Sequence, residues 1–261
     1  MKRSRESAPR TKAPATADVD RLDAHELVAE VERRLAPLGT PARAQGEKAY
    51  LKSDLDFLGV PMQPLRQFAA ALLQERPELT GGALRRAVLA LWQPRIHELR
   101  TVAIELLARR RRELVVADLE LFEGLLRDAR TWAYVDTIAT RLVAEVVERH
   151  GAEAEVAATL DRWAVDPDFW LRRTAMLALL PQLRRGAGDW PRFVRYADAQ
   201  LADREFFLRK AIGWILREVG KQRPTLVVEF LAPRLARTSA LTLREAVKYL
   251  PEEMQKGLRK N

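Results

Sequence analysis

A leucine–arginine motif recurs along this chain at a regular spacing, and that spacing constrains the fold more than any other feature. The motif, followed two or three residues later by alanine, occurs in PLRQFAA, ELRTVAI, WLRRTAM, FLRKAIG and TLREAVK. Successive arginines are 34, 72, 37 and 35 residues apart, and 72 is twice 36. Such a period, with two helices per unit, is typical of an α-solenoid, whose units stack because one helix pair cannot bury its apolar face alone.

The remaining patterns agree with an all-α chain. In the segment LRTVAIELLARRRREL, the side chains of Leu99, Val102 and Leu106 fall on one helical stripe. Alternating β-branched runs and Asn-Gly turns do not occur. Glycine and proline mark the expected breaks at Gly39–Pro41, Gly81–Gly82, Gln93–Pro94, Asp166–Pro167, Gly186–Gly188 and Arg223–Pro224. We therefore expect about a dozen helices, that is, about six two-helix units, in a single domain over residues 18–261.

The motif arginines are expected to line up on one surface of the solenoid, because equivalent positions of successive units do so. They are Arg66, Arg100, Arg172, Arg209 and Arg244. The copy missing from the 72-residue interval should fall at position 136, where YVDTIAT carries Asp136 in the arginine slot. A carboxylate in a basic track repels phosphate, so this residue needs another task. Two alternatives stay open: each arginine is solvated or paired with a glutamate of the next unit, and Asp136 pairs with a neighbouring arginine.

The charge of the chain points to an anionic partner. Lys plus Arg number 45 against 36 Asp plus Glu, a formal charge of +9, which favours nucleic acid, an anionic membrane surface or an acidic protein. There is no cysteine, and the three histidines lack metal-ligand spacing, so we expect no metal and no cofactor. Residues 1–17 carry five basic residues and little to bury, and we expect a disordered tail there. Without an apolar targeting segment or membrane span, a cytoplasmic protein is expected.

Two tryptophans lie beside charged repeat positions. Trp132 precedes Asp136 by one helical turn, and Trp214 follows Arg209 by five residues. Indole faces beside a carboxylate form a receptor for a delocalised cation. A cation pocket inside a polyanion-binding groove suits DNA that carries an N-alkylated purine, whose glycosidic bond breaks through a cationic sugar. Three further tryptophans are assigned to the core: Trp92, Trp163 and Trp190.

Several motifs resemble the AlkD-type DNA alkylation repair glycosylases, which are built from HEAT-like helical repeats. They are RTWAYVDTIA, FWLRRTAMLALLPQL, FFLRKAIGWILRE and LTLREAVKYL, and the resemblance runs from about residue 45 to residue 250. It implies a HEAT-like solenoid with a concave basic face. It also implies a monofunctional, metal-independent glycosylase that removes cationic purines of the 3-methyladenine and 7-methylguanine type from double-stranded DNA without flipping the base.

The resemblance assigns roles residue by residue. It implies that Asp136 is catalytic, that Trp132 and Trp214 contact the lesion, and that Arg173 clamps a phosphate. The residues expected to bind DNA are Tyr50, Arg66, Arg100, Arg172, Arg209, Lys210, Arg217 and Arg244. The chain departs from the family pattern at Ala133 and at Gly59–Val60–Pro61, which bears on substrate range more than on the chemistry.

Two other functions fit the same sequence. One is a non-catalytic helical-repeat protein that binds damaged or branched DNA, and the other is a scaffold for an acidic protein. Neither of them needs a cation site, so the acid with its two tryptophans favours the glycosylase. We expect a nucleoid-associated monomer that requires no protein partner.

Overall fold

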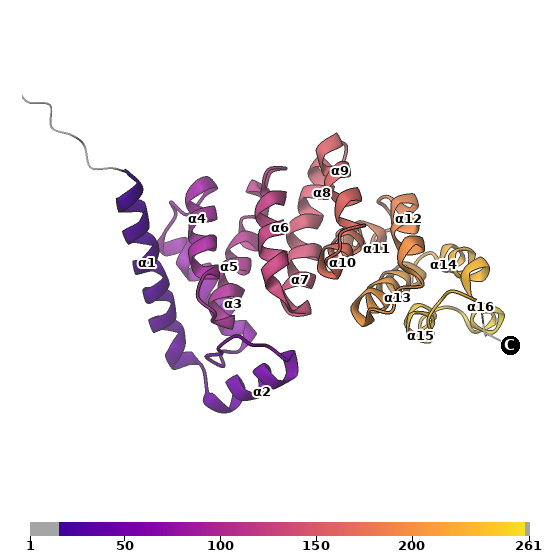
Figure 1. The fold of residues 1–261 in the computed structure, drawn as a ribbon, viewed down its shortest axis with the longest axis horizontal. Coiled ribbons are helices and arrows are strands. Elements are labelled where there is room, and N and C mark those ends of the chain that lie inside the picture. The colour runs from indigo at the N-terminus through magenta and orange to yellow at the C-terminus, as the bar shows by residue number, and fades with distance from the viewer. Residues whose placement is uncertain (1–15, 259–261) are drawn as a thin grey trace, which may run out of the picture.

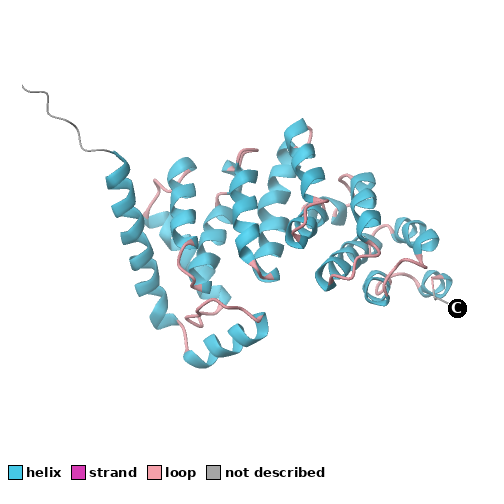
Figure 2. Ribbon diagram, viewed as in Figure 1, coloured by secondary structure: helices cyan, strands magenta, loops and turns pink. Residues whose placement is uncertain are grey.

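The described part of the chain is helical from end to end. The computed structural model describes residues 16–258, with side chains from Ala24 onward, and within this range its one strand-like feature is an isolated bridge between Asp56 and Ile96. Helices cover the ribbon in Figure 2 apart from short connections. The predicted all-α helical-repeat solenoid is confirmed. The predicted tail lies outside the described residues, except that helix α1 already begins at Thr16.

The helices form two rows that run along the molecule (Figure 1). The outer row contains α1 (Thr16–Leu35), α4 (Gly81–Trp92), α6 (Asp118–Ala129), α9 (Ala154–Trp163), α12 (Trp190–Gln200) and α14 (Pro224–Leu231). The inner row contains α3 (Met62–Glu75), α5 (His97–Arg109), α7 (Trp132–Thr137) continued by α8 (Ala144–His150), α10 (Phe169–Leu177) with α11 (Leu180–Arg184), α13 (Phe206–Gly220) and α15 (Ala240–Ala246). Outside the rows lie α2 (Pro41–Leu51), α16 (Glu252–Gly257) and the 3-10 turns Ala36–Leu38, Arg111–Glu113 and Ala232–Arg234.

One apolar core runs the length of the described chain between the two rows. Inner helices pack on outer helices and on one another, as α5 does on α4 and α3, and α13 on α14, α10 and α15. Trp92 and Trp163 are buried in this core and Trp190 packs against it half-buried, as the sequence predicts. No helix in residues 16–258 is long and apolar enough to cross a membrane.

Helix boundaries coincide with the breaks expected from the sequence. The side chain of Thr40 accepts a hydrogen bond from the amide of Arg43 and so caps α2. Gly186 and Gly188 have φ values of 82° and 81°, a left-handed conformation that glycine adopts without strain, and they form the turn before α12. Local residue chemistry therefore ends each unit where the period requires a turn.

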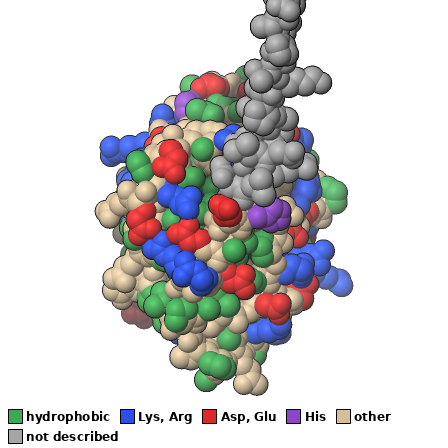
Figure 3. Space-filling model, turned by 90° about the vertical axis from the view of Figure 1, so that its left-hand side faces the viewer, with side chains coloured by type: hydrophobic (Ala, Val, Ile, Leu, Met, Phe, Trp, Pro, Cys, Tyr) green, Lys and Arg blue, Asp and Glu red, His purple; other side chains and the backbone are tan. Residues whose placement is uncertain are grey.

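Charged side chains of both signs cover the N-terminal end of the molecule (Figure 3). Arg34 of α1 pairs with Glu75 of α3 at 2.7 Å and with Glu30 at 2.9 Å, and its guanidinium lies 4.8 Å from the ring centre of Phe68. Basic side chains are thus used within the protein, in ion pairs that join neighbouring helices.

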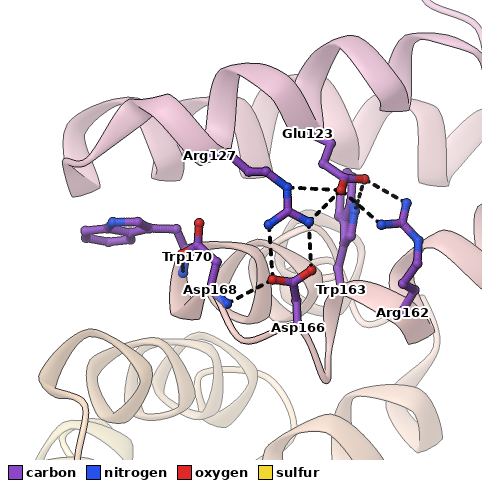
Figure 4. Close-up of polar contacts among 7 residues, drawn as sticks. All are labelled: Glu123, Arg127, Arg162, Trp163, Asp166, Asp168 and Trp170. Carbon is purple, nitrogen blue, oxygen red and sulfur yellow. Dashed lines mark hydrogen bonds and ion pairs between the residues drawn. The ribbon is translucent and has the colours of Figure 1, made fainter.

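A network of polar side chains joins α6 to α9 and to the start of α10 (Figure 4). The carboxylate of Glu123 accepts hydrogen bonds from Arg162 at 2.7 Å, from Arg127 at 2.7 Å and from the indole of Trp163 at 2.8 Å. Arg127 continues to Asp166 at 2.8 Å, and Asp166 accepts from the amide of Asp168, the residue before α10. The network therefore fixes the start of α10, the inner helix that carries Arg173.

We predict that Glu123→Gln destabilises the fold by about 2 kcal/mol at neutral pH and by less in acid. Its hydrogen bond with Arg162, joined by those from Trp163 and Arg127, lowers the pKa of Glu123 from 4.5 to about 2. Because the folded-state pKa is the lower one, this stabilisation is complete above pH ~4.5 and is lost as the pH falls toward 2. Urea unfolding of both proteins from pH 7 to pH 3 measures the difference.

The control is Glu148→Gln, which removes an exposed ion pair with Arg185 at 2.7 Å. It should change the free energy of unfolding by less than ~1 kcal/mol at every pH. A pH-independent difference between wild type and Glu123→Gln would contradict the assignment.

Candidate active site

A single pocket of about 330 Å³ collects residues from helices that are far apart in sequence. Its walls come from α2, α7, α10, α13 and α15, so the inner row curves around it and its face is concave there. The lining residues are Tyr50, Trp132, Asp136, Arg173, Phe206, Phe207, Lys210, Trp214, Arg217 and Glu245. All four residues predicted to carry the chemistry, Asp136, Trp132, Trp214 and Arg173, are therefore together.

Asp136 lies at the point where the helix of its repeat changes its winding. It belongs to the last turn of α7, and a π-helical turn, Ile138–Val143, follows directly. The hydroxyl of Thr140 donates a hydrogen bond to the carbonyl oxygen of Asp136 at 2.6 Å. π-Helical turns inside α-helices are frequent at functional sites, where they re-aim the side chains around them.

The carboxylate of Asp136 is held by Arg173 of the next repeat. Nε and Nη2 of Arg173 donate to Oδ1 and Oδ2 of Asp136 at 2.8 and 2.9 Å, a two-point contact of planar groups. Nη1 of Arg173 donates to the carbonyl oxygen of Phe207. The alternative left open by the sequence, an arginine partner for Asp136, is thus realised, and the pair lies inside the pocket.

This pairing bears on the phosphate contact predicted for Arg173. In the unbound protein its side chain is 5% exposed and three of its N–H groups donate to protein acceptors. These bonds fix the orientation of Asp136, and the phosphate contact stays a prediction. The carboxylate itself is 19% exposed, and each of its oxygens keeps a further lone pair beyond the one that Arg173 uses.

Aromatic rings line the same pocket as the carboxylate. Tyr50 is 71% exposed and meets Trp132 edge to face, with ring centres 6.0 Å apart. Trp132 and Trp214 are half-buried and pack against the core, so one part of each indole is anchored and another lines the pocket. Aromatic faces attract cations electrostatically, and the attraction strengthens when water is excluded.

A buried acid holds the segment that positions α2 and therefore Tyr50. The carboxylate of Glu98, which is fully buried, accepts from the amides of Leu58, Gly59 and Val60 at 2.8, 2.7 and 3.1 Å. Gly59 has φ 77°, and a Cβ there would lie 2.2 Å from the carbonyl oxygen of Thr40. Only glycine fits this position, which explains the Gly-Val-Pro segment at the end of the α2 region.

The pocket contains a second carboxylate, Glu245, that the sequence analysis missed. It accepts from Lys210 at 2.8 Å and from Arg217 at 2.7 Å. The hydrogen bond from Lys210 is the largest influence on Glu245 and lowers the pKa of its carboxyl group below the usual value. Lys210 and Arg217, both predicted to bind DNA, therefore share one pocket carboxylate as their partner in the unbound protein.

The five motif arginines do not form one exposed track. Arg66 and Arg244 are exposed, whereas Arg172 pairs with Asp203 at 2.8 Å and Arg209 donates to the carbonyl oxygen of that same residue at 2.7 Å.

Arg100 is the clear correction among the residues predicted to bind DNA. Its side chain is 4% exposed, with Nε bonded to the carbonyl oxygen of Trp92 at 3.0 Å and Nη2 to Asp128 at 2.8 Å. Its guanidinium also lies 4.8 Å from the ring centre of Trp92. Arg100 therefore holds helices together and is not an exposed contact for DNA.

The pocket residues that the sequence analysis missed stand next to residues that it identified. Glu245 follows a motif arginine by one position, as the predicted residues Lys210 and Arg173 do, so the row that faces the pocket is offset by one residue from the motif. Phe206 and Phe207 precede the motif FLRKAIG and could have been found by the same alignment. The histidines lie elsewhere: His97 stacks on Phe57, and burial lowers its pKa to about 4.

This chain is similar to a known protein family and to solved structures. A family model described as DNA alkylation repair enzyme matches residues 31–250. A structure described as a predicted DNA alkylation repair enzyme from Enterococcus faecalis is 25% identical and superposes with a TM-score of 0.73 over 82% of this chain and 97% of that one. AlkD2 from Streptococcus mutans is 15% identical, with a TM-score of 0.59 over 87% and 99% of the two chains. No curated protein sequence matches the chain.

Fold and site together define a helical-repeat protein with a charged, aromatic pocket on its concave face. The chain belongs to the DNA alkylation repair enzyme family, because the family match covers most of its length. The resemblance seen in the sequence is thereby confirmed, and the protein acts in the repair of alkylated DNA.

We predict that Arg100→Met destabilises the fold by about 2 to 3 kcal/mol, because it removes the buried donor to the carbonyl oxygen of Trp92 and to Asp128. Arg244→Met, at an exposed motif position, should change the free energy of unfolding by no more than ~0.5 kcal/mol. Urea denaturation followed by tryptophan fluorescence compares the two. Equal stability of both variants would show that Arg100 is not a structural residue.

Proposed function

We propose that this enzyme is a DNA glycosylase that hydrolyses the N-glycosidic bond of cationic alkylated purines in double-stranded DNA. The observation that carries the proposal is the Asp136 carboxylate, fixed by Arg173 at 2.8 and 2.9 Å in a pocket that five aromatic side chains also line. Family membership supports alkylated DNA as the substrate.

The chemistry follows from the charge of the lesion. Alkylation at purine N3 or N7 makes the base positive, so it leaves readily with the electron pair of the bond to C1′ of deoxyribose. The departing base becomes neutral, and the positive charge moves to the sugar as an oxocarbenium-like ion. Water adds to C1′ and loses a proton, which completes the hydrolysis.

Asp136 supplies a counterion for the charge that develops on the sugar. A carboxylate that is already oriented stabilises this charge without reorganisation, and such fixed groups contribute the most to catalysis in sites shielded from water. The two hydrogen bonds from Arg173 partly neutralise the Asp136 carboxylate, but they also prevent this carboxylate from rotating. The lone pairs that Arg173 leaves unused are the ones available to the sugar and to the attacking water.

Trp132, Trp214 and Tyr50 form the walls against which the cationic nucleotide rests. Because the carboxylate acts on the sugar, the reaction needs access to C1′ and not to the edges of the base. The proposal therefore includes hydrolysis without base flipping. Arg66, Arg172, Arg209, Lys210, Arg217 and Arg244 remain the proposed contacts to the DNA backbone, and Arg100 is excluded from this set by its burial.

We predict that Asp136→Asn lowers the rate of base release by about 10²- to 10³-fold, because the amide keeps the shape but loses the charge. The measurement is single-turnover release of free 7-methylguanine from a methylated duplex. Affinity for undamaged duplex should change little, since Asp136 faces a cation and not a phosphate.

The matched control is Asp198→Asn, which alters another ion pair between repeats, with Arg234 at 2.7 Å, outside the pocket. This variant should release base at the wild-type rate. Wild-type protein that binds duplex but releases no base would instead support the non-catalytic alternative. Equal rates for wild type and Asp136→Asn would remove this residue from the mechanism.

A further inference from the structure

We propose that Glu245 is a specificity-determining residue that exchanges its partners when DNA binds: phosphates take Lys210 and Arg217, and the released carboxylate faces the positively charged nucleotide. The inference rests on the proposed function, because it concerns the same pocket and the same class of substrate. It goes further in assigning a second acid and a way to distinguish cationic nucleotides from neutral ones.

The position of Glu245 depends on a close approach of two inner helices. A Cβ at Gly213 would lie 2.6 Å from Cβ of Glu245, so a residue other than glycine would push α15 away from α13. Gly213 directly precedes Trp214 in the chain. The same glycine that lets the helices meet thus brings the second carboxylate beside the indole that lines the pocket.

The two cations on Glu245 are accessible to a polyanion. The side chain of Lys210 is 39% exposed and that of Arg217 is 23% exposed, whereas Glu245 is 16% exposed. A DNA phosphate can approach the cations from the groove, while the carboxylate stays at the wall of the pocket.

The charge of the pocket changes sign in this exchange. In the unbound protein the pocket holds three cations, Arg173, Lys210 and Arg217, against two acids, Asp136 and Glu245. Phosphate oxygens make strong charge-assisted hydrogen bonds with lysine and arginine, and binding is favoured by release of counterions from the DNA. Once phosphates neutralise two of the cations, the two acids exceed the remaining one, and the pocket favours a positive ligand.

A purely structural role is the competing explanation, in which Glu245 only joins α15 to α13. The two roles differ in what they predict for charge recognition. If Glu245 only joins the helices, its substitution changes the affinity for all ligands equally. If Glu245 selects by charge, its substitution changes the affinity for a cationic ligand more than for a neutral one of the same shape.

The experiment measures dissociation constants for two duplexes that differ at one nucleotide. One carries a cationic pyrrolidine analogue of the abasic sugar, and the other carries the neutral tetrahydrofuran analogue. Wild type should prefer the cationic duplex. Glu245→Gln should reduce this preference about 5- to 10-fold and bind undamaged duplex more tightly, because Lys210 and Arg217 lose their internal partner. Glu245→Asp, which keeps the charge, should retain most of the preference.

The matched control is Asp198→Asn on the outer row, whose carboxylate also accepts from two arginines, Arg234 at 2.7 Å and Arg237 at 2.5 Å. It should leave the preference unchanged. Lys210→Met should have the opposite effect. It leaves Glu245 less neutralised and should therefore raise the preference for the cationic duplex. If Glu245→Gln folds poorly, this variant still decides the matter.

An unchanged preference in Glu245→Gln, or an unchanged or lowered one in Lys210→Met, would overturn the inference. Binding and base release are measured separately, so the two proposals can fail independently. Loss of charge preference in Glu245→Gln together with full base release by Asp136→Asn would keep the selector and remove the proposed catalytic group.

Discussion

The bidentate ion pair between Asp136 and Arg173 is the interaction on which the site depends. It joins two consecutive repeats, since the residues are 37 positions apart, and it fixes a carboxylate that would otherwise rotate freely at the wall of a pocket. The orientation of Arg173 is in turn set by the carbonyl oxygen of Phe207 in the following repeat. Three successive units therefore determine where one pair of oxygen atoms lies, and any change in their stacking moves the candidate catalytic group.

Ion pairs between adjacent repeats recur along the solenoid with different residues. Glu105 is buried and accepts from Arg141, 36 positions later, at 2.5 Å, while Lys210 reaches Glu245, 35 positions later, at 2.8 Å. Ion pairs at this spacing connect equivalent places in adjacent units, as expected where each unit contacts only its neighbours. The total of 45 lysines and arginines therefore overstates how many cations are free to meet DNA. The pocket differs from the other junctions because its pairs face a cavity lined by aromatic rings.

The period of the sequence was sufficient to predict the fold, because a repeat of this length admits few ways to bury its helices. Glycine and proline breaks predicted the connections for local reasons, as at Gly186 and Gly188. For the site, the interrupted arginine series and the helical spacing of Trp132 led to Asp136, and the resemblance added Tyr50 and Arg173. These residues do line one pocket.

What the period could not predict is the rotation of each helix about its own axis. Neighbouring residues on a helix point about 100° apart, so an alignment that is correct in register can still select the wrong side chain. Arg100 occupies a motif position but turns into the protein, while Lys210 and Glu245, one position past the motif, line the pocket. For the same reason the period did not point to Arg173, the partner of Asp136. Arg173 follows the motif arginine Arg172 by one position.

The segment before α3 illustrates how a departure from a family pattern can leave the site intact. Pro61 supplies no amide, and it stands at the N-cap of α3 with φ −61° and ψ 152°. The preceding amides of Leu58, Gly59 and Val60 are those that bind the carboxylate of Glu98, so the support of this segment does not require an amide at position 61. Proline restricts the backbone where the chain turns into the helix, which strengthens the connection to α2. Tyr50 is therefore held by a buried acid and a rigid turn that do not depend on an amide at position 61.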